Sequence, residues 1–391
     1  MRYASFIDQI ASDATKGWGV LDAAFGDQEQ GADVIILAIG DPDFPTPPRI
    51  VDEAVTALRS GDTHYSEIQG RHQLRTTIAE RFTKQTGVSW SKDNVMVFAG
   101  TQNALFAASL CLLEPGTEVI ALDPSYLTYE ATLRASGASL VTVPLDPETG
   151  FRIDVERIAA AVTHRTRAIV INSPNNPTGA LASQAELHDL AALAIDRDLW
   201  VVADEVYSEI VFAGRHRSIA AAPGMQERTV TVSSLSKSHA MTGWRIGWAI
   251  APAPLTAHFA KLGMVMAYGV PGFIQEAAIT ALTAGDDAMT EMVDTYRRRR
   301  DLAAAIFAHH DVPVLVPEAG MYLLVDVRQV PLDPSELVWD LYRKTGVAVV
   351  DAGAFGANAQ GWLRVAFTNS DARIEEGCRR IAQYVTTSIT N

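Results

Sequence analysis

The sequence predicts an α/β protein in which a mostly parallel, seven-stranded sheet is flanked by helices. Two observations lead to this class: short apolar runs rich in Val and Ile recur between residues 95 and 250, and helical stretches separate them. Runs that are apolar at nearly every position are typical of strands buried on both faces, and strands that alternate with helices favour parallel pairing. The predicted strands are residues 95–99, 118–122, 139–143, 168–172, 199–203, 230–233 and 246–250.

The connecting segments include two clear helix candidates. Residues 102–113 are one, and residues 183–197 are the other, because they open with the capping-box pair Ser183 and Glu186. In a capping box, each of the two side chains accepts a hydrogen bond from the backbone N–H of the other residue. Parallel sheets bind ligands beyond the carboxyl ends of their strands, where loops and helix N-termini converge. We therefore expect the functional residues at these strand ends.

A second, smaller α+β domain is predicted towards the C-terminus. From about residue 288 the sequence continues with a long charged helix through YRRRRDLAAAIF, strand-like residues 321–327 and 346–350, and a final helix from about residue 371. The first 50 residues, which include the proline-rich GDPDFPTPP, do not follow the alternating pattern. The predicted division is a large domain at residues 51–287 and a small domain at residues 288–391, which residues 1–50 join.

Composition excludes several classes of protein. Of the 391 residues, 48% are hydrophobic and 20% are charged, which is ordinary for a soluble chain with two cores. No apolar run approaches the roughly 18 residues of a membrane helix, and a formal net charge of −14 disfavours nucleic acid as a partner. Residues 1–18 carry scattered charges in place of the apolar core of a secretory signal, which predicts a cytoplasmic protein. Cys111 and Cys378 have no CxxC or metal-like spacing, so we expect inert thiols and no metal.

Polar residues follow several of the predicted strands. Gly100 and Thr101 open a helix after the first strand, where free N–H groups and the helix dipole favour an anion. Tyr126, in LDPSYLTY, is placed to stack on a flat ring, and Asn176, in NSPNNPTG, offers a side-chain amide at the same edge. Each feature also has a purely structural interpretation, as an ordinary turn or a packing tyrosine.

Asp204 ends the strongly apolar strand of VVADEVYSEI. A carboxylate buried at this position is costly without a cationic partner, although a role as a helix cap is the alternative. Tyr207 follows three residues later and would offer its hydroxyl to the same ligand.

The stretch SLSKSHAMTGWRIGW, residues 234–248, places Lys237 among Ser234, Ser236 and Ser238, with Arg245 downstream. This composition is typical of a phosphate pocket around a reactive amine, and the alternative is a solvated loop. One ligand would satisfy all of these groups, because it has a flat ring, a phosphate arm, a pyridinium nitrogen, a phenolate oxygen and an aldehyde. That ligand is pyridoxal 5′-phosphate.

In order and spacing, these motifs resemble those of the fold-type I pyridoxal-phosphate enzymes, and specifically the class I/II aminotransferases. The matching pieces, which span most of the chain, are GDPDF, THYSEIQG, AGTQNAL, DPSY, SPNNPTG, DEVY, SLSKSHAMTGWRIG and GWLRVAF. The resemblance implies three catalytic residues, namely Lys237, Asp204 and Tyr207. The cofactor-binding residues that it implies are Tyr65, Gly100, Thr101, Gln102, Tyr126, Asn176, Asp204, Tyr207, Ser234, Lys237 and Arg245. The substrate-binding residues that it implies are Gly40, Tyr126, Asn176 and Arg364.

The resemblance also implies chemistry and assembly. Lys237 would bind the cofactor covalently and, once displaced by an amino acid, act as the general base, while Asp204 would keep the ring nitrogen cationic. A 2-oxo acid would then accept the amino group, so ping-pong kinetics are expected. Tyr65 is expected to reach the phosphate of a neighbouring subunit, which implies a homodimer with shared active sites.

The substrate is indicated less directly. In the aspartate aminotransferases a lysine is expected in the GTQNAL region to bind a distal carboxylate, and here Gln102 takes its place. The strings THYSEIQG, SLSKSHAMTGWRIGW, GVPGFIQ and YRRRRDLA are most similar to bacterial arginine:pyruvate transaminases. This resemblance implies L-arginine or another basic amino acid as donor and pyruvate as acceptor. Glu67 and Asp43 are candidate partners for a guanidinium, although either also fits a plain surface acid. The consecutive arginines at residues 297–300 fit a solvated or subunit-facing helix surface.

Several alternatives remain at this stage. An aspartate- or aromatic-type aminotransferase of broad specificity would use the same residues, and so would a C–S β-lyase or an oxidase, because the same carbanion has several fates. A non-enzymatic sensor built on this fold is disfavoured. Such regulators carry a basic helix-turn-helix domain ahead of the fold, whereas here only about 30 residues precede the first motif region and the chain is acidic. A nicotinamide dehydrogenase is disfavoured because no GxGxxG follows a predicted strand.

Overall fold

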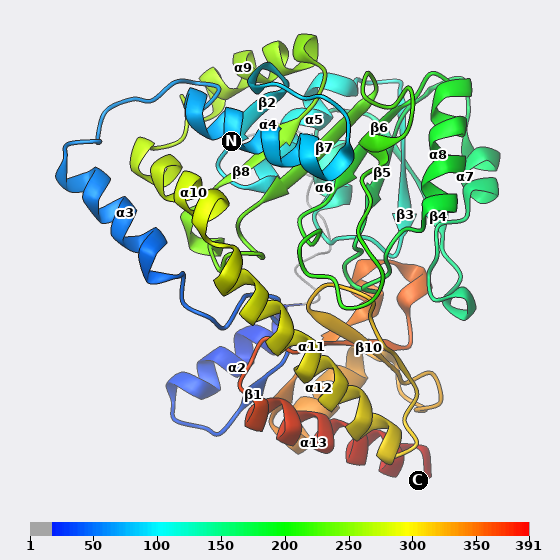
Figure 1. The fold of residues 1–391 in the computed structure, drawn as a ribbon. Coiled ribbons are helices and arrows are strands. Elements are labelled where there is room, and N and C mark those ends of the chain that lie inside the picture. Colours follow the sequence, from blue (N-terminus) through cyan, green and yellow to red (C-terminus); the bar gives the residue numbers. More distant parts are fainter. Residues whose placement is uncertain (1–17, 391) are drawn as a thin grey trace, which may run out of the picture.

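The computed structural model describes residues 18–390. Figure 1 shows a larger part built around a central sheet and a smaller part below it, with the long helix α11 (Asp286–His309) running from one to the other. The seven strands of the central sheet lie in the order β2-β8-β7-β6-β5-β3-β4. Of these, β8 alone runs in the direction opposite to the other six. The strands are β2 (Val95–Phe98), β3 (Glu118–Asp123), β4 (Ser139–Pro144), β5 (Thr166–Asn172), β6 (Trp200–Asp204), β7 (Thr229–Ser234) and β8 (Gly247–Ile250). The predicted α/β fold with a mostly parallel seven-stranded sheet is confirmed.

Helices cover both faces of this sheet, which explains why its strands are buried at nearly every position, apart from the edge strand β4, in which three of six residues are exposed. Met96 and Phe98 of β2 pack on one face with residues of α5, α6 and α9. Val95 and Val97 point to the opposite face, which α4 and α10 cover at this end and α7 and α8 cover at the other. The helices are α3 (Pro48–Arg59), α4 (His72–Thr86), α5 (Thr101–Leu112), α6 (Tyr129–Arg134), α7 (Val155–Ala161), α8 (Gln184–Asp196), α9 (Ala253–Met266) and α10 (Gly272–Ala284). The capping box that opens α8 is formed.

The strand ends converge at one edge of the sheet. Asn172, Asp204 and Ser234 are the last residues of the parallel strands β5, β6 and β7. Because β8 runs the other way, the residues just before it reach the same edge. A Cβ atom at Gly247, the first residue of β8, would lie 2.7 Å from the backbone nitrogen of Thr101. The absence of a side chain there lets the turn after β2 pack directly against the start of β8.

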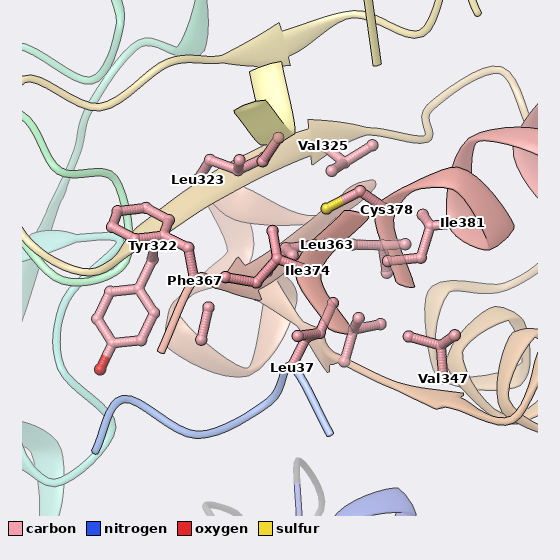
Figure 2. Close-up of a cluster of buried hydrophobic side chains, with 14 of the residues drawn as sticks. Leu37, Tyr322, Leu323, Val325, Val347, Leu363, Phe367, Ile374, Cys378 and Ile381 are labelled. Atoms are coloured by element: carbon pink, nitrogen blue, oxygen red, sulfur yellow. The ribbon is translucent and has the colours of Figure 1, made fainter. Parts of the chain in front are cut away.

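The smaller part contains a four-stranded antiparallel sheet in the order β12-β13-β10-β9, together with a two-stranded pair of β1 and β11. Figure 2 shows its core, where side chains of β10 and β13 meet those of α13 beside Leu37 and Val347. Its helices and strands are α2 (Gly19–Glu29), β1 (Ile35–Ile36), β9 (Val314–Leu315), β10 (Tyr322–Asp326), α12 (Pro334–Thr345), β11 (Val347–Ala348), β12 (Val350–Asp351), β13 (Trp362–Ala366) and α13 (Asp371–Thr390).

Two details of the smaller part refine the sequence analysis. The predicted single strand at residues 346–350 is wrong: β11 pairs with β1, whereas β12 pairs with β13, because the chain changes partner at Val349. The pairing of residues 35–36 with residues 347–348 ties the N-terminal segment to this part of the molecule. Both predicted domain limits, 50/51 and 287/288, fall inside helices, α3 and α11, and the limits stay predictions.

Candidate active site

A cavity of about 350 Å³ opens at the carboxyl edge of the central sheet and also contacts β10 and β13 of the smaller part. Most of the residues predicted to bind cofactor or substrate line it. These are Gly40, Thr101, Gln102, Tyr126, Asn176, Asp204, Tyr207, Ser234, Lys237, Arg245 and Arg364. Side chains from distant parts of the sequence therefore meet where the parallel-sheet rule places a ligand.

Lys237 lies three residues after β7 and is half-buried. Its Nζ atom donates a hydrogen bond of 2.7 Å to the carbonyl oxygen of Gly40. This partner is neutral, so the amine can turn to a ligand in the cavity without leaving a carboxylate unpaired.

Asp204 is only 4% exposed at the end of β6. Its Oδ2 atom accepts a hydrogen bond of 2.7 Å from the hydroxyl of Tyr129, and its Oδ1 atom accepts one of 3.2 Å from the backbone of Val206. Burial raises the pKa of Asp204 to about 6, although both hydrogen bonds oppose the rise. The cationic partner expected for this carboxylate is not supplied by a protein side chain within residues 18–390, so Asp204 is prepared for a cation that a ligand would bring.

Tyr129 is a site residue that the sequence analysis missed. It is fully buried, and its ring packs edge-on against Tyr126 with the ring centres 5.8 Å apart. The available signal was its place at the start of α6, three residues after Tyr126 in the loop that follows β3. Tyr129 thus donates its hydroxyl to Asp204 from outside the cavity, whereas Tyr126 lines the cavity.

Arg364 is buried on β13, with 3% of its surface exposed. Its guanidinium lies over the rings of Tyr322, at 4.1 Å, and Phe355, at 4.5 Å. Its two terminal nitrogens donate to the Asn176 side chain, at 3.1 Å, and to the Ala38 carbonyl, at 2.6 Å. The Nε atom is buried without a partner in the described chain. A flat, desolvated guanidinium with donors to spare is suited to bind a carboxylate through two parallel hydrogen bonds.

Asn176 and Tyr207 complete this side of the cavity. The backbone N–H of Asn176 donates to the side chain of Asn172, whose own amide donates to the Asp204 carbonyl at 2.9 Å. The hydroxyl of Tyr207 lies 3.3 Å from that of Tyr322. Burial raises the pKa of Tyr207 well above its usual value, so its hydroxyl remains a donor.

An anion-binding cradle lies at the other end of the cavity. Gly100 has a φ of 88° and precedes α5, whose free N–H groups point into the site. A Cβ atom at Gly100 would lie 2.5 Å from a terminal nitrogen of Arg245, so glycine is needed for this approach. The Thr101 hydroxyl is buried without a partner in the described residues, and the Ser234 hydroxyl accepts only a long bond of 3.3 Å from Ser236. These unsatisfied donors fit a phosphate group.

Two predicted residues are placed differently from the rest. The Gln102 side chain lines the cavity, but its amide is held by Thr132, at 2.6 Å, and by Thr128, at 2.7 Å. Tyr65 does not line the cavity: it is 85% exposed, with its ring 4.9 Å from that of Tyr268. Within a single chain, Tyr65 therefore has no contact with the site.

The candidate partners for a guanidinium also lie outside the cavity. Glu67 is exposed and accepts a hydrogen bond from Ser66. Asp43 already binds Arg299 of the same chain, at 2.8 Å. The prediction that residues 297–300 face solvent or a subunit is wrong for Arg299, which is 7% exposed and also pairs with Asp371 at 2.8 Å. Its guanidinium lies 5.5 Å from the ring of Phe44, so this arginine joins α11 to the N-terminal segment.

Other features of residues 18–390 can be stated briefly. They contain no cluster of His, Cys, Asp and Glu side chains that could hold a metal ion, and none of their helices is long and apolar enough to cross a membrane. Burial raises the pKa of Cys111 to about 11 and that of Cys378 to about 12, which keeps both thiols protonated at neutral pH.

Together, the cavity offers an amine, a buried acid without a cationic partner, an aromatic ring, unsatisfied donors suited to a phosphate and a buried guanidinium suited to a carboxylate. This donor set fits pyridoxal 5′-phosphate with an amino-acid substrate beside it. The architecture is that of the fold-type I transferases. The chain belongs to the family of class I and II aminotransferases, whose sequence model matches residues 32–381, and it is an aminotransferase. Members of this family depend on pyridoxal phosphate.

Similar proteins cover nearly the whole chain. It is 46% identical over 98% of both chains to the arginine–pyruvate transaminase AruH of Pseudomonas aeruginosa. It is 36% identical to an aspartate/prephenate aminotransferase of Thermus thermophilus, over 91% of this chain and 92% of that one. The solved structure of the Thermus thermophilus aspartate aminotransferase with maleate superposes with a TM-score of 0.92 at 34% identity, over 98% of this chain and all of that one.

Proposed function

We propose that the protein transfers the amino group of L-arginine, or of another basic amino acid, to pyruvate with pyridoxal 5′-phosphate as cofactor. The observation that carries this proposal is the meeting of Lys237, Asp204 and Arg364 around one cavity. The preference for arginine and pyruvate is supported by the similarity to the Pseudomonas transaminase.

Each predicted residue has a defined part in holding the cofactor. Bound there, pyridoxal phosphate supplies an electron sink for the bonds around the substrate Cα. Lys237 holds it covalently, Asp204 pairs with the ring nitrogen, and Tyr126 packs on the ring. Asn176 and Tyr207 donate to the ring oxygen. The phosphate would be bound by the side chains of Thr101, Ser234 and Arg245 and by the backbone N–H groups of Gly100, Thr101 and Gln102 at the start of α5.

The reaction needs a carboxylate clamp and a proton carrier. Arg364 and Asn176 orient the α-carboxylate of the amino acid. Glycine is needed at position 40 because a Cβ atom there would lie 1.5 Å from the hydroxyl of Tyr322, whose ring packs on Arg364. The freed Nζ of Lys237 removes the proton from the substrate Cα and later returns one. Asp204 remains ionised while it is paired with a cation, because an opposite charge lowers its pKa.

Asp41 is the residue that we assign to the arginine side chain. It lines the cavity, it is exposed, and it has no ion pair or hydrogen bond within the described chain. The other carboxylate that lines the cavity, Asp204, is occupied at the closed end. Asp41 is therefore the acid available to replace water around a guanidinium. Trp18 and Tyr126 line the same cavity and offer ring faces to such a cation.

The path of the chain favours this assignment. The Ala38 carbonyl meets Arg364, and the Gly40 carbonyl meets Lys237. The segment thus passes the carboxylate end of a bound amino acid first, then its amine, and continues to Asp41. Three residues span about 10 Å when extended, which is on the order of the length of an extended arginine.

Replacing Asp41 with asparagine is expected to lower kcat/KM for L-arginine by about 10- to 100-fold, because one charge-assisted contact contributes about 1.5–3 kcal/mol. L-Citrulline has the same shape with a neutral ureido group, and its kcat/KM should change little. Steady-state rates for both donors with pyruvate measure this selectivity. Asp52→Asn, at an exposed acid of α3, is the matched control. An equal loss for arginine and citrulline would contradict the assignment.

The proposal extends to assembly. Tyr65, which is 85% exposed, contacts the ring of Tyr268, which is 50% exposed, and α9 just before Tyr268 exposes two further apolar side chains, Met264 at 49% and Val265 at 78%. Tyr65 and Tyr268 line a common surface hollow. A patch of this kind is typical of a protein interface. We assign it to a homodimer in which Tyr65 of each subunit reaches the phosphate cradle of the other. A cytoplasmic location stays a prediction.

The direct test of the function is an assay of purified protein with L-arginine and pyruvate, in which alanine and the 2-oxo acid of arginine should form in equal amounts. Aspartate and phenylalanine in place of arginine test the aspartate- and aromatic-type alternatives. Release of thiol from L-cystathionine, or of peroxide from arginine, without alanine formation would indicate a lyase or an oxidase and would contradict the proposal.

A further inference from the structure

Glu205 and His216 form a buried pair directly behind Asp204. The Oε2 atom of Glu205 lies 3.0 Å from Nε2 of His216, and their side chains are only 5% and 4% exposed. Glu205 follows Asp204 in the sequence, so two consecutive residues at the end of β6 carry buried carboxylates. Neither Glu205 nor His216 lines the cavity that contains Lys237.

Two adjacent buried carboxylates are unfavourable when both are charged. Burial is the main cause of the raised pKa of Asp204, and the negative charge of Glu205 raises it further. A charge on a neighbouring histidine cancels this second effect, since an ion pair has little net field at a distance. Whether His216 is charged therefore influences whether Asp204 remains ionised beside Glu205.

The surroundings of the pair contain other charged groups, which must be considered. Glu205 shares a small cavity with Arg81, Glu209 and His239, and His216 lines a surface groove with Arg81, Lys84, Glu209, Arg215 and Asp286. Arg81 is bound by Leu282 and Asp286, at 2.7 and 3.2 Å, and Tyr129 faces Asp204 from α6. Burial lowers the pKa of His239 to about 4, so His239 is neutral under ordinary conditions. Of these groups, His216 alone bonds the Glu205 carboxylate in the described chain.

The second ring nitrogen of His216 is also informative. Nδ1 is buried and has no partner among residues 18–390, although His216 lines the surface groove. A protonated imidazole needs an acceptor at each nitrogen, so a charged His216 would take up a water at Nδ1 from the groove side. His216 thus borders the groove and not the catalytic cavity.

We propose that Glu205 and His216 are positioning residues that set the charge of Asp204: protonated His216 neutralises Glu205, which leaves Asp204 as the single net negative charge for the cofactor's ring nitrogen. This inference rests on the proposed cofactor. It gives the pair behind the sheet edge an electrostatic part in the reaction, in addition to its packing.

The test measures binding of pyridoxamine 5′-phosphate to the apo-protein over a range of pH, because this probe cannot bond covalently to Lys237. Its affinity falls at low pH as Asp204 becomes protonated. His216→Asn should move this fall upwards by about one pH unit, which weakens binding about 2-fold at pH 7 and about 10-fold at pH 5. The double variant Glu205→Gln, His216→Asn has neither charge, and its pH profile should return to that of the natural protein.

Controls separate this role from a structural one. His188→Asn changes an exposed histidine of α8 and should leave the profile unchanged. With Glu205→Gln alone, the affinity for pyridoxamine 5′-phosphate should fall at the same pH as in the natural protein or at a lower pH. This variant tests the inference even if His216→Asn does not fold. A His216→Asn profile that coincides with the natural one, or a double variant as impaired as the single one, would overturn the inference. Failure of the natural protein to bind the probe would instead contradict the proposed cofactor.

Discussion

Lys237→Ala is expected to lower the rate of transamination by about 10⁴-fold. Alanine removes both the amine that holds the cofactor and the base that carries the Cα proton. The cavity loses little else, because the Nζ hydrogen bond to Gly40 is the contact that ties the lysine to the opposite wall. Single-turnover absorbance changes with L-arginine measure the loss.

A second lysine serves as the control for this experiment. Lys261 lies exposed on α9, outside the cavity, and Lys261→Ala should retain the natural rate. The thermal unfolding temperature of Lys237→Ala should stay close to that of the natural apo-protein. A Lys237→Ala protein that is folded and turns over at more than a few per cent of the natural rate would contradict the assigned role.

Asp204→Asn is expected to have two opposite effects. Transamination should fall by about 100-fold, because a neutral amide cannot pair with a cationic ring nitrogen. The apo-protein, in contrast, should become more stable at neutral pH. The reason is that burial raises the pKa of Asp204 from its ordinary 3.8 to about 6.

The sign of the stability effect follows from the order of proton release. As pH rises above 3.8 the unfolded chain releases the Asp204 proton first, while the folded protein holds it until about pH 6. Stability is therefore lost between these two values and stays lost at higher pH. The gap corresponds to at most about 3 kcal/mol, which asparagine would recover. Below pH 3.8 Asp204 is protonated in both the folded and the unfolded protein, so the stability gain of Asp204→Asn should vanish.

Denaturant unfolding of the two apo-proteins at neutral and acidic pH measures this difference, with Asp52→Asn again as the control. Tyr129 can donate to the amide oxygen of asparagine as it does to Asp204, so the local contact is kept. An Asp204→Asn protein that is less stable at neutral pH, or whose gain persists unchanged in acid, would contradict the account of this carboxylate.

Much of the fold could be predicted because the strands of the central sheet, apart from the edge strand β4, are buried on both faces. Their apolar runs mark each strand to within about two residues, and the polar residues that follow them mark the functional edge. Lys237 and Asp204 were identifiable because each is a charged residue at or just after the end of an apolar strand, where burial needs a reason. Arg364 was identified only through the resemblance of GWLRVAF to the aminotransferases. The glycine at position 100 was similarly marked by its place before a helix.

The remainder depends on tertiary contacts that no local pattern carries. Tyr322 and Phe355 enclose Arg364 only because β10 and the segment before β13 meet the sheet edge. Arg299 is buried because the segment that contains Asp43, far away in sequence, packs against α11 and Asp43 pairs with it. The two short strands after α12 were read as one because a strand of two residues is defined by its partner and not by its composition.

The most direct test of the central claim is borohydride reduction of the protein with pyridoxal 5′-phosphate, followed by peptide mapping. Reduction fixes a pyridoxyl group permanently on the lysine that binds the cofactor. The account predicts one modified peptide, containing SLSKSHAMTGW, with the group on Lys237. An unmodified Lys237, or a pyridoxyl group on a different lysine, would contradict it.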